Sequence, residues 1–433
     1  MSAPVAGGST VVVTGLGVLG AVAAGPEDFA AALREGRSAL LAPAPPPDAD
    51  RPGASWPAFT ADLAADDVPD RALDALPGLP PELRALARRT TLRAPVPVRA
   101  AVVAALQAWL GAGLDRTAPA PERVGVVVAG SNLTERVTED SRARAARSPA
   151  HLPARYALHH QDTDHVATLS RVLGVRGEGC TVGGASASGN VALVHGARML
   201  AAGAADLCLV VGAMTRLSGL QTRGFLSLGA MAPAHGAPPR PPAPFDLGHR
   251  GFHPGQAAGC LVLETAASAH RRGARALAGF AGGTVVLDGN HLADPSVDGE
   301  VRAMTGALAQ AGVGPADLGW VSAHGTGSPL GDRTEAEALR EVFGTDGEGP
   351  WVNATKALSG HCLSAAGVVE AVAAVLQLRD GFVHPDPGLD DPVDPGLRLV
   401  REEPRRPSGG FVLSNGFGFG GFNTAVVLAH PDT

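Results

Sequence analysis

The chain has 433 residues, of which 45% are hydrophobic, and a formal net charge of −7 at pH 7. The apolar content suffices for a large core, and the negative charge argues against nucleic acid as the main partner. No apolar run approaches a membrane span and the N-terminus lacks a secretory leader pattern, so we expect a soluble, cytoplasmic protein with no membrane partner. The four cysteines lie far apart in apolar segments, which predicts buried thiols and neither a metal site nor a disulfide framework.

The first part of the chain alternates between buried strands and helices. The pattern predicts strands at 10–14 and 123–129 and helices at 26–35, 96–110 and 165–173. Two stretches lack a clear period. We interpret 42–81 as a surface excursion with at most short helices, and 132–164 as a cap or a subunit-contact excursion.

The stretch GCTVGGASASGN, from Gly179 to Asn190, is a short strand-like run that breaks at two glycines and turns into an apolar helix near Ser186. Free N–H groups and the macrodipole at a helix N-terminus favour negative charge, so this position suits a nucleophile whose intermediate carries an oxyanion. A plain serine cap is the alternative. The helix is apolar on several faces and leads into a buried strand at 206–211, which indicates a parallel sheet covered on both faces.

The second part of the chain repeats this order of strand, loop, buried helix and strand, which suggests an internal duplication. The expected elements are helices at 301–311 and 364–378, strands at 320–323, 351–354, 411–414 and 424–430, and a glycine-rich loop at 415–421. Thr334 and Glu337 are spaced as a capping box. Lys356 is the only lysine among 35 basic residues. Since arginine does not replace a compact ammonium, Lys356 either has a specific role or remained by chance.

Three further motifs follow one another: HGTGS at His324–Ser328, KALSGH at Lys356–His361 and NGFGFGG at Asn415–Gly421. With ASASG around Ser186, they resemble the β-ketoacyl-acyl-carrier-protein synthases, the condensing enzymes of fatty-acid and polyketide synthesis, over nearly the whole chain. The resemblance implies an α/β, thiolase-type fold of two pseudo-repeated halves in five layers, α-β-α-β-α. We expect the halves to be residues 1–268, with the nucleophile, and 269–433, with the catalytic histidines and lysine.

The resemblance also implies roles for single residues. Ser186 takes the place of the family's nucleophilic cysteine, and His324, His361 and Lys356 match its catalytic histidines and lysine. The supporting residues are Glu370 in the helix after the second histidine, Thr326 and Ser328 at the phosphopantetheine arm, Phe417 and Phe419 in the loop that gates the acyl pocket, and the backbone N–H groups of Ser186 and Phe419 as the oxyanion hole.

The sequence departs from the family pattern near these residues. A serine hydroxyl needs a neighbouring base to take its proton, and His361 or His324 could serve. Gly183 and Gly184 stand where the family has polar residues, and Gln256 replaces the usual glutamate.

We therefore expect a ketosynthase-like acyltransferase that acts on acyl thioesters of a carrier protein or coenzyme A, with Ser186 accepting the acyl group. An oxyester is a weaker acyl donor than a thioester, which favours ester, amide or carbanion formation as the second step. The alternatives are a malonyl-thioester decarboxylase without a covalent intermediate and a non-condensing partner resembling a chain-length factor. The retained His324, His361 and Lys356 argue against the partner role.

The same resemblance implies the small molecules and proteins that the chain meets. We expect no cofactor and no metal, with the phosphopantetheine arm of a carrier protein or coenzyme A as the substrate carrier. The expected partners are an acyl carrier protein and a second subunit, in a homodimer or in a heterodimer with a paralogous ketosynthase.

Overall fold

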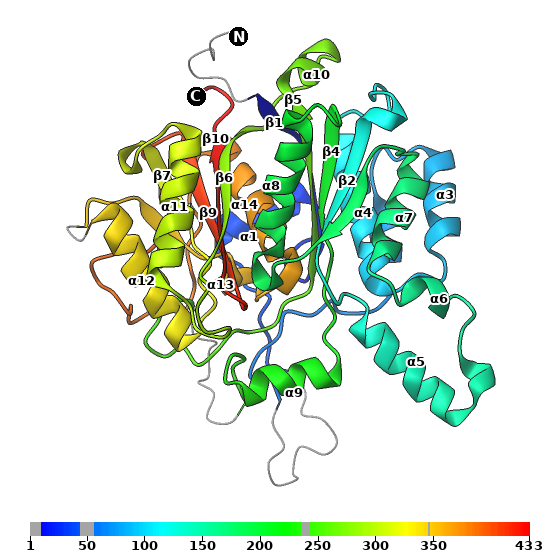
Figure 1. Ribbon diagram of the computed structural model, residues 1–433, viewed down its shortest axis with the longest axis horizontal. Helices are drawn as coiled ribbons and strands as arrows, with labels where there is room; N and C mark the ends of the chain where they lie inside the picture. The colour runs from blue at the N-terminus through cyan, green and yellow to red at the C-terminus, as the bar shows by residue number, and fades with distance from the viewer. Residues whose placement is uncertain (1–9, 44–55, 235–242, 345–346) are drawn as a thin grey trace.

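The computed structural model describes residues 10–43, 56–234, 243–344 and 347–433 (Figure 1). The strands are β1 Val11–Gly20, β2 Val124–Ala129, β3 Gly179–Val182, β4 Leu207–Gly212, β5 Ala257–Thr265, β6 Ala278–Leu287, β7 Leu318–Ser322, β8 Trp351–Asn353, β9 Phe411–Gly418 and β10 Phe422–Ala429. The helices are α1 Pro26–Glu35, α2 Val68–Ala75, α3 Pro81–Thr91, α4 Val96–Gly111, α5 Glu135–Arg147, α6 Tyr156–His159, α7 Thr163–Leu173, α8 Ser188–Ala201, α9 Gly219–Ser227, α10 Ala266–Arg271, α11 Val297–Ala311, α12 Pro329–Phe343, α13 Lys356–Ser359 and α14 Ala366–Asp380.

The strands are hydrogen-bonded in the order β3-β2-β4-β5-β1-β6-β10-β9-β7-β8. In the first half, β2 is parallel to β3 and β4, and β5 is antiparallel to β4 and β1. In the second half, β7 is parallel to β8 and β9, and β10 is antiparallel to β9 and β6. The two sets of strands therefore share one topology, which confirms the predicted pair of pseudo-repeated halves.

Helices divide the molecule into layers (Figure 1). The central layer contains α8 and α14, which pack against each other and against strands of both halves. Helices α4 and α7 cover the outer face of the first half, while α11, with α12 beside it, covers the outer face of the second. Apolar clusters fill the spaces between these layers. The arrangement is the five-layer fold expected from the sequence.

The two central helices approach each other through glycines. A β-carbon on Gly189 of α8 would lie 2.6 Å from the Cα of Gly367 in α14, and one on Gly367 would lie 2.7 Å from the backbone N of Asn190. Neither position has room for a side chain. This close approach brings together the starts of α8 and α14, which begin two residues after Ser186 and five residues after His361.

Several predicted boundaries differ from the structure. The stretch 132–164, in which the sequence shows no clear period, contains α5 and α6, and its interpretation as a cap or subunit-contact excursion stays a prediction. The described part of the excursion at 42–81 contains the short helix α2, in line with the expectation of at most short helices, while 44–55 lie outside the described residues. The predicted loop 415–421 is mostly strand, because β9 continues to Gly418 and pairs with β10 in a hairpin. The proposed boundary between residues 268 and 269 falls inside α10 and stays a prediction.

The glycine contact gives a test of how the halves are joined. We expect Gly189→Ala to lower the free energy of unfolding by about 2–3 kcal/mol, because the added methyl group forces two backbones apart. Urea unfolding measures this change. Gly224→Ala in α9, where nothing lies within 4 Å of the added β-carbon, is the matched control and should be neutral or slightly stabilising. Equal effects of the two changes would contradict the close packing.

Candidate active site

Ser186 lies in a short turn that joins β3 to α8. The backbone of Ala185 has a φ of 48°, a left-handed conformation that L-residues rarely adopt, and residues Ala185–Ala187 form one 3₁₀ turn before the helix begins. The Ser188 hydroxyl secures this turn by donating to the Ala185 carbonyl (2.6 Å) and accepting from the Gly184 N–H (2.9 Å). Ser186 therefore has a fixed backbone at the foot of a buried helix, close to the predicted position.

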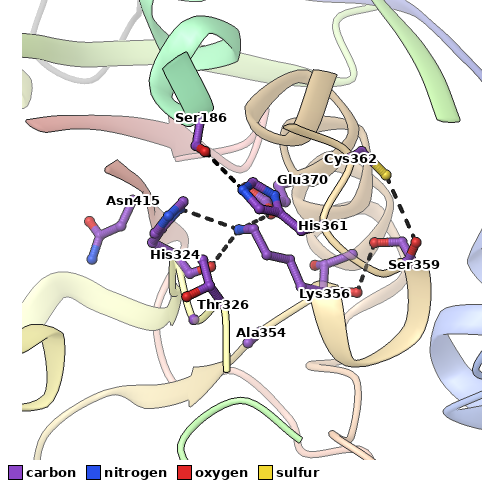
Figure 2. A network of polar contacts seen from close by, with 12 residues as sticks. Ser186, His324, Thr326, Ala354, Lys356, Ser359, His361, Cys362, Glu370 and Asn415 are labelled. Atoms are coloured by element: carbon purple, nitrogen blue, oxygen red, sulfur yellow. Dashed lines mark hydrogen bonds and ion pairs between the residues drawn. The ribbon is translucent and has the colours of Figure 1, made fainter. Parts of the chain in front are cut away.

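His361 contacts this serine directly. Its Nε2 lies 2.8 Å from the Ser186 Oγ (Figure 2). Its Nδ1 accepts the N–H of Leu363 (3.3 Å). Leu363, with a φ of 51°, opens a second 3₁₀ turn before α14, so the turn at Ser186 recurs in the other half. The structure brings together the two residues that the sequence motifs placed 175 positions apart.

Lys356 connects His324 with Glu370. Its Nζ donates to Glu370 Oε1 (2.5 Å) and to the His324 carbonyl oxygen, and lies 3.4 Å from His324 Nδ1 (Figure 2). All three residues come from different segments: the loop after β7, the start of α13, and α14. The Lys356 and Glu370 side chains are almost fully buried, so this ion pair has no contact with bulk water.

Both imidazoles are neutral, and the same nitrogen of each carries the proton. Burial, and then the positive charge of Lys356, hold the pKa values of His324 and His361 well below the usual 6.5. A neutral imidazole has one donor and one acceptor nitrogen. Because Nδ1 accepts in both residues, from Leu363 in one and from Lys356 in the other, Nε2–H is the donor in both. The site thus offers two N–H donors.

Two carboxylates that the sequence analysis did not single out hold the HGTGS loop. Glu335 accepts the N–H groups of His324 (2.8 Å) and Gly325 (2.7 Å), and Asp332 accepts those of Thr326 (3.1 Å) and Gly327 (3.0 Å). The backbone N–H groups of four successive residues, 324–327, therefore all point toward α12. The sequence signal was Asp-x-x-Glu, four residues after the motif, on one face of a helix.

The loop residues that precede α12 differ in one respect from the prediction. Ser328 caps the helix, since its hydroxyl accepts the Gly331 N–H (3.2 Å). Thr334 lies inside α12 and bonds to the Leu330 carbonyl, so the predicted capping box of Thr334 and Glu337 is wrong. The helix begins earlier because Pro329 is well suited to its first position.

A cavity of about 640 Å³ opens in front of these groups. Its walls contain most of the predicted site residues, namely Ser186, His324, His361, Thr326, Ser328, Phe417 and Phe419. Lys356 and Glu370 lie behind the histidines and do not line it. Phe419 is 43% exposed, whereas Phe417 is buried with its ring 5.6 Å from that of His324.

The end of β9 packs against the turn at Ser186. A β-carbon on Gly418 would lie 3.1 Å from the Ser186 backbone N and 2.6 Å from the Gly184 carbonyl oxygen. Only a glycine allows this approach, which brings the backbone next to Phe419 near the Ser186 N–H. The oxyanion hole made by the N–H groups of Ser186 and Phe419 stays a prediction.

The described residues contain neither a cluster of metal-ligating side chains nor a helix suited to cross a membrane. No group of three or more His, Cys, Asp or Glu residues among them is placed to hold a metal ion. Nor does any of their helices have the length and apolar character needed to cross a membrane.

Comparison with protein families matches the chain to two successive models. Residues 8–269 match the beta-ketoacyl synthase N-terminal domain, and residues 277–390 match the beta-ketoacyl synthase C-terminal domain. Together these two matches cover most of the chain.

Individual relatives match over nearly their full lengths. The chain is 35% identical to the polyketide biosynthesis malonyl-ACP decarboxylase PksF of Bacillus subtilis, over 96% of both proteins. It is 30% identical to 3-oxoacyl-[acyl-carrier-protein] synthase 2 of Coxiella burnetii, over 97% of this chain and 98% of that protein. Among solved structures, a beta-ketoacyl synthase from Burkholderia phymatum has a TM-score of 0.82 at 28% identity, covering 98% of this chain and 100% of that one.

The electrostatic role of Lys356 can be tested by titrating the imidazoles. Replacing the ion pair by Lys356→Met with Glu370→Gln removes the ammonium without leaving a buried carboxylate unpaired. We expect the pKa values of His324 and His361 to rise toward 6.5 but to stay below it, because burial is the larger cause of both shifts. NMR titration of the imidazole Cε1–H signals measures this. Arg333→Met, an exposed charge on α12, is the control, and unchanged histidines in the double variant would contradict the assignment.

Proposed function

The chain belongs to the beta-ketoacyl synthase family, and we propose that it decarboxylates a malonyl group carried as a thioester on an acyl carrier protein. The observation that carries this proposal is the pair of neutral imidazoles, each with its Nε2–H as the donor, in the wall of one cavity. Loss of CO2 from a malonyl thioester leaves an enolate. Its negative oxygen needs donors that are in place before the charge develops.

The reaction follows from these donors. The malonyl thioester binds with its carbonyl oxygen toward the Nε2–H groups of His324 and His361, and this oxygen then replaces the Ser186 Oγ as the acceptor of the His361 N–H. The bond between the α-carbon and the carboxylate breaks, CO2 leaves, and the electron pair moves into the enolate whose oxygen the two imidazoles hold. The α-carbon then takes a proton from water, which gives an acetyl thioester. Neither histidine changes its charge, so each remains a donor throughout.

The protonation state of His361 also decides whether this histidine can act as a base for Ser186. A base for Ser186 must accept the hydroxyl proton, whereas the Nε2 of His361 already carries a proton and donates to the Ser186 Oγ. We infer that Ser186 replaces the family's cysteine and stays unacylated. The replacement removes the acyl-enzyme step that condensation needs and leaves the decarboxylating donors intact.

Similarity to named proteins supports this function. The Bacillus subtilis relative that matches along its whole length is called a malonyl-ACP decarboxylase, in polyketide biosynthesis. The thioester would reach the histidines on a phosphopantetheine arm, with the Thr326 and Ser328 hydroxyls as contacts in the cavity wall. A similar solved structure is described as the ishigamide ketosynthase/chain length factor, at 27% identity and a TM-score of 0.80 over 98% of this chain and 99% of that one. It supports a paired subunit, either a second copy or a paralogue.

The second candidate function is acyl transfer through Ser186. The contact of 2.8 Å between its Oγ and the His361 Nε2 favours it, because this is hydrogen-bond reach for a nucleophile and its base. It requires the other tautomer of His361, which would turn the Leu363 N–H and a protonated Nδ1 toward each other. Because two N–H donors would then face each other, acyl transfer is the less favoured of the two functions.

Ser186→Ala separates the two functions. We expect CO2 release from malonyl-carrier protein to stay within about tenfold of the wild-type rate, because one hydrogen bond to His361 is lost and no bond-forming group is removed. Mass spectrometry of the carrier protein and of the peptide containing residue 186 measures both products. Ser408→Ala, an exposed serine, is the control. A stable acyl adduct on wild-type Ser186, together with loss of turnover in the alanine variant, would reject the decarboxylase in favour of acyl transfer.

Removing a donor should slow the reaction much more. We expect His324→Ala and His361→Ala each to lower kcat by about 100-fold, the usual cost of losing one donor to a developing oxyanion. Release of CO2 from malonyl-carrier protein under saturation is the measurement, and His270→Ala, an exposed histidine, is the control. Unchanged kcat in both variants would show that the imidazoles do not hold the enolate.

A further inference from the structure

One wall of the cavity carries acidic side chains that the proposed reaction does not use, and those of Glu300 and Asp288 are buried. This wall is built from the segments that lead into α11 and α12, two helices that pack together (Figure 1). It contains Glu300 and Asp288, together with Leu292 and Leu330, which are 74% and 57% exposed. Because these leucines reach the surface, a ligand that enters the cavity on this side passes the two carboxyl groups.

Each of the two carboxyl groups has a buried oxygen without a partner. Glu300 is 1% exposed, and its Oε2 forms no hydrogen bond. The Asp288 Oδ1 accepts the Asn423 side-chain N–H (2.6 Å), while its Oδ2 has no partner. A β-carbon on Gly299 would lie 1.7 Å from Asp288 Oδ1, so Asp288 rests on the backbone directly before Glu300. A buried oxygen without a hydrogen-bond partner lowers the stability of the fold unless a ligand supplies that partner.

The surroundings give the two groups different roles. Burial, and then the charges of Glu335, Asp288 and Asp332, raise the pKa of Glu300 well above its usual range, so its carboxyl group keeps a proton. Burial also raises the pKa of Asp288, but the Asn423 hydrogen bond and Arg302, at 4.0 Å, oppose this shift. Glu300 therefore presents an O–H donor, and the unpartnered Oδ2 of Asp288 in the same wall offers an acceptor.

We infer that Glu300 and Asp288 form a subsite for a secondary amide of the carrier arm. The Glu300 O–H donates to the amide carbonyl, and the Asp288 Oδ2 accepts the amide N–H. An alkyl chain or a lone hydroxyl would leave at least one of the two unpaired, whereas an amide satisfies both. The identity of the ligand rests on the proposed function, because the carrier thioester is what brings an amide-containing arm here. Binding at this wall sets how far the thioester extends toward His324 and His361.

The subsite can be tested by binding alone, with phosphopantetheine as the probe. We expect Glu300→Leu to weaken its affinity about fivefold to tenfold, because the amide carbonyl loses its donor. Glu300→Gln should stay within about twofold, since a neutral side-chain amide still donates. Asp298→Asn, an exposed carboxylate in the first turn of the same helix, is the matched control. Equal affinity of the wild type and Glu300→Leu would overturn the subsite, as would a loss in Glu300→Gln as large as that in Glu300→Leu.

Kinetics with two substrates then connect binding to turnover. For malonyl-phosphopantetheine we expect Glu300→Leu to raise KM with little change in kcat, while malonyl ethyl thioester, which has no amide, should be turned over equally by variant and wild type. Equal losses on both substrates would overturn the assignment. If the wild type released CO2 from neither, the proposed function would fail, whereas the binding result above would still decide the subsite.

A spectroscopic measurement covers the case in which Glu300→Leu does not fold. We expect phosphopantetheine to shift an infrared carboxylic-acid C=O band of the wild-type protein, and the band to be absent from Glu300→Gln. A band that is present but does not respond to the probe would overturn the amide contact.

Discussion

The buried ammonium of Lys356 is the interaction on which the site depends. It joins a carboxylate on the central helix α14 to the backbone and ring of His324, and its charge adds to the effect of burial in keeping both imidazoles neutral. These acceptors converge on one nitrogen, a geometry that suits a compact ammonium and not the planar fork of a guanidinium. This accounts for a single lysine in a chain that uses arginine everywhere else.

Preorganisation is the second theme of the site. Asp332 and Glu335 hold four successive N–H groups of the loop that carries His324, so the loop has its final form before a substrate binds. Donors fixed in this way do not need to reorganise as negative charge develops. Burial of Glu335 raises the pKa of its carboxyl group to about 7, which shows how strongly this part of the molecule disfavours a charged side chain.

The sequence predicted the fold and the grouping of the candidate site residues, because both leave local patterns in the sequence. Apolar runs located the strands. The motifs located Ser186, His324 and His361, which line the cavity, and Lys356, which lies behind the two histidines. The tautomers of His324 and His361 could not be predicted from the sequence, because they depend on the Leu363 N–H and on the position of Lys356 in space. Glu300 was missed for the same reason. In the sequence, Glu300 looks like one of the acidic residues that are common in the first turn of a helix. Only the tertiary structure shows that its side chain is buried.

The strand order has a consequence for how the chain acquires its structure. β1 is made first, but it pairs with β5 and β6, and its Thr14 hydroxyl donates to Glu264, 250 positions later. Contacts between such distant segments form slowly, because a long loop must close before they stabilise anything. β1 therefore cannot complete its pairing until β5 and β6 have been synthesised. The glycine contact between α8 and α14 needs a helix that is made later still, so Ser186 and His361 can meet only when more than four fifths of the chain has been synthesised.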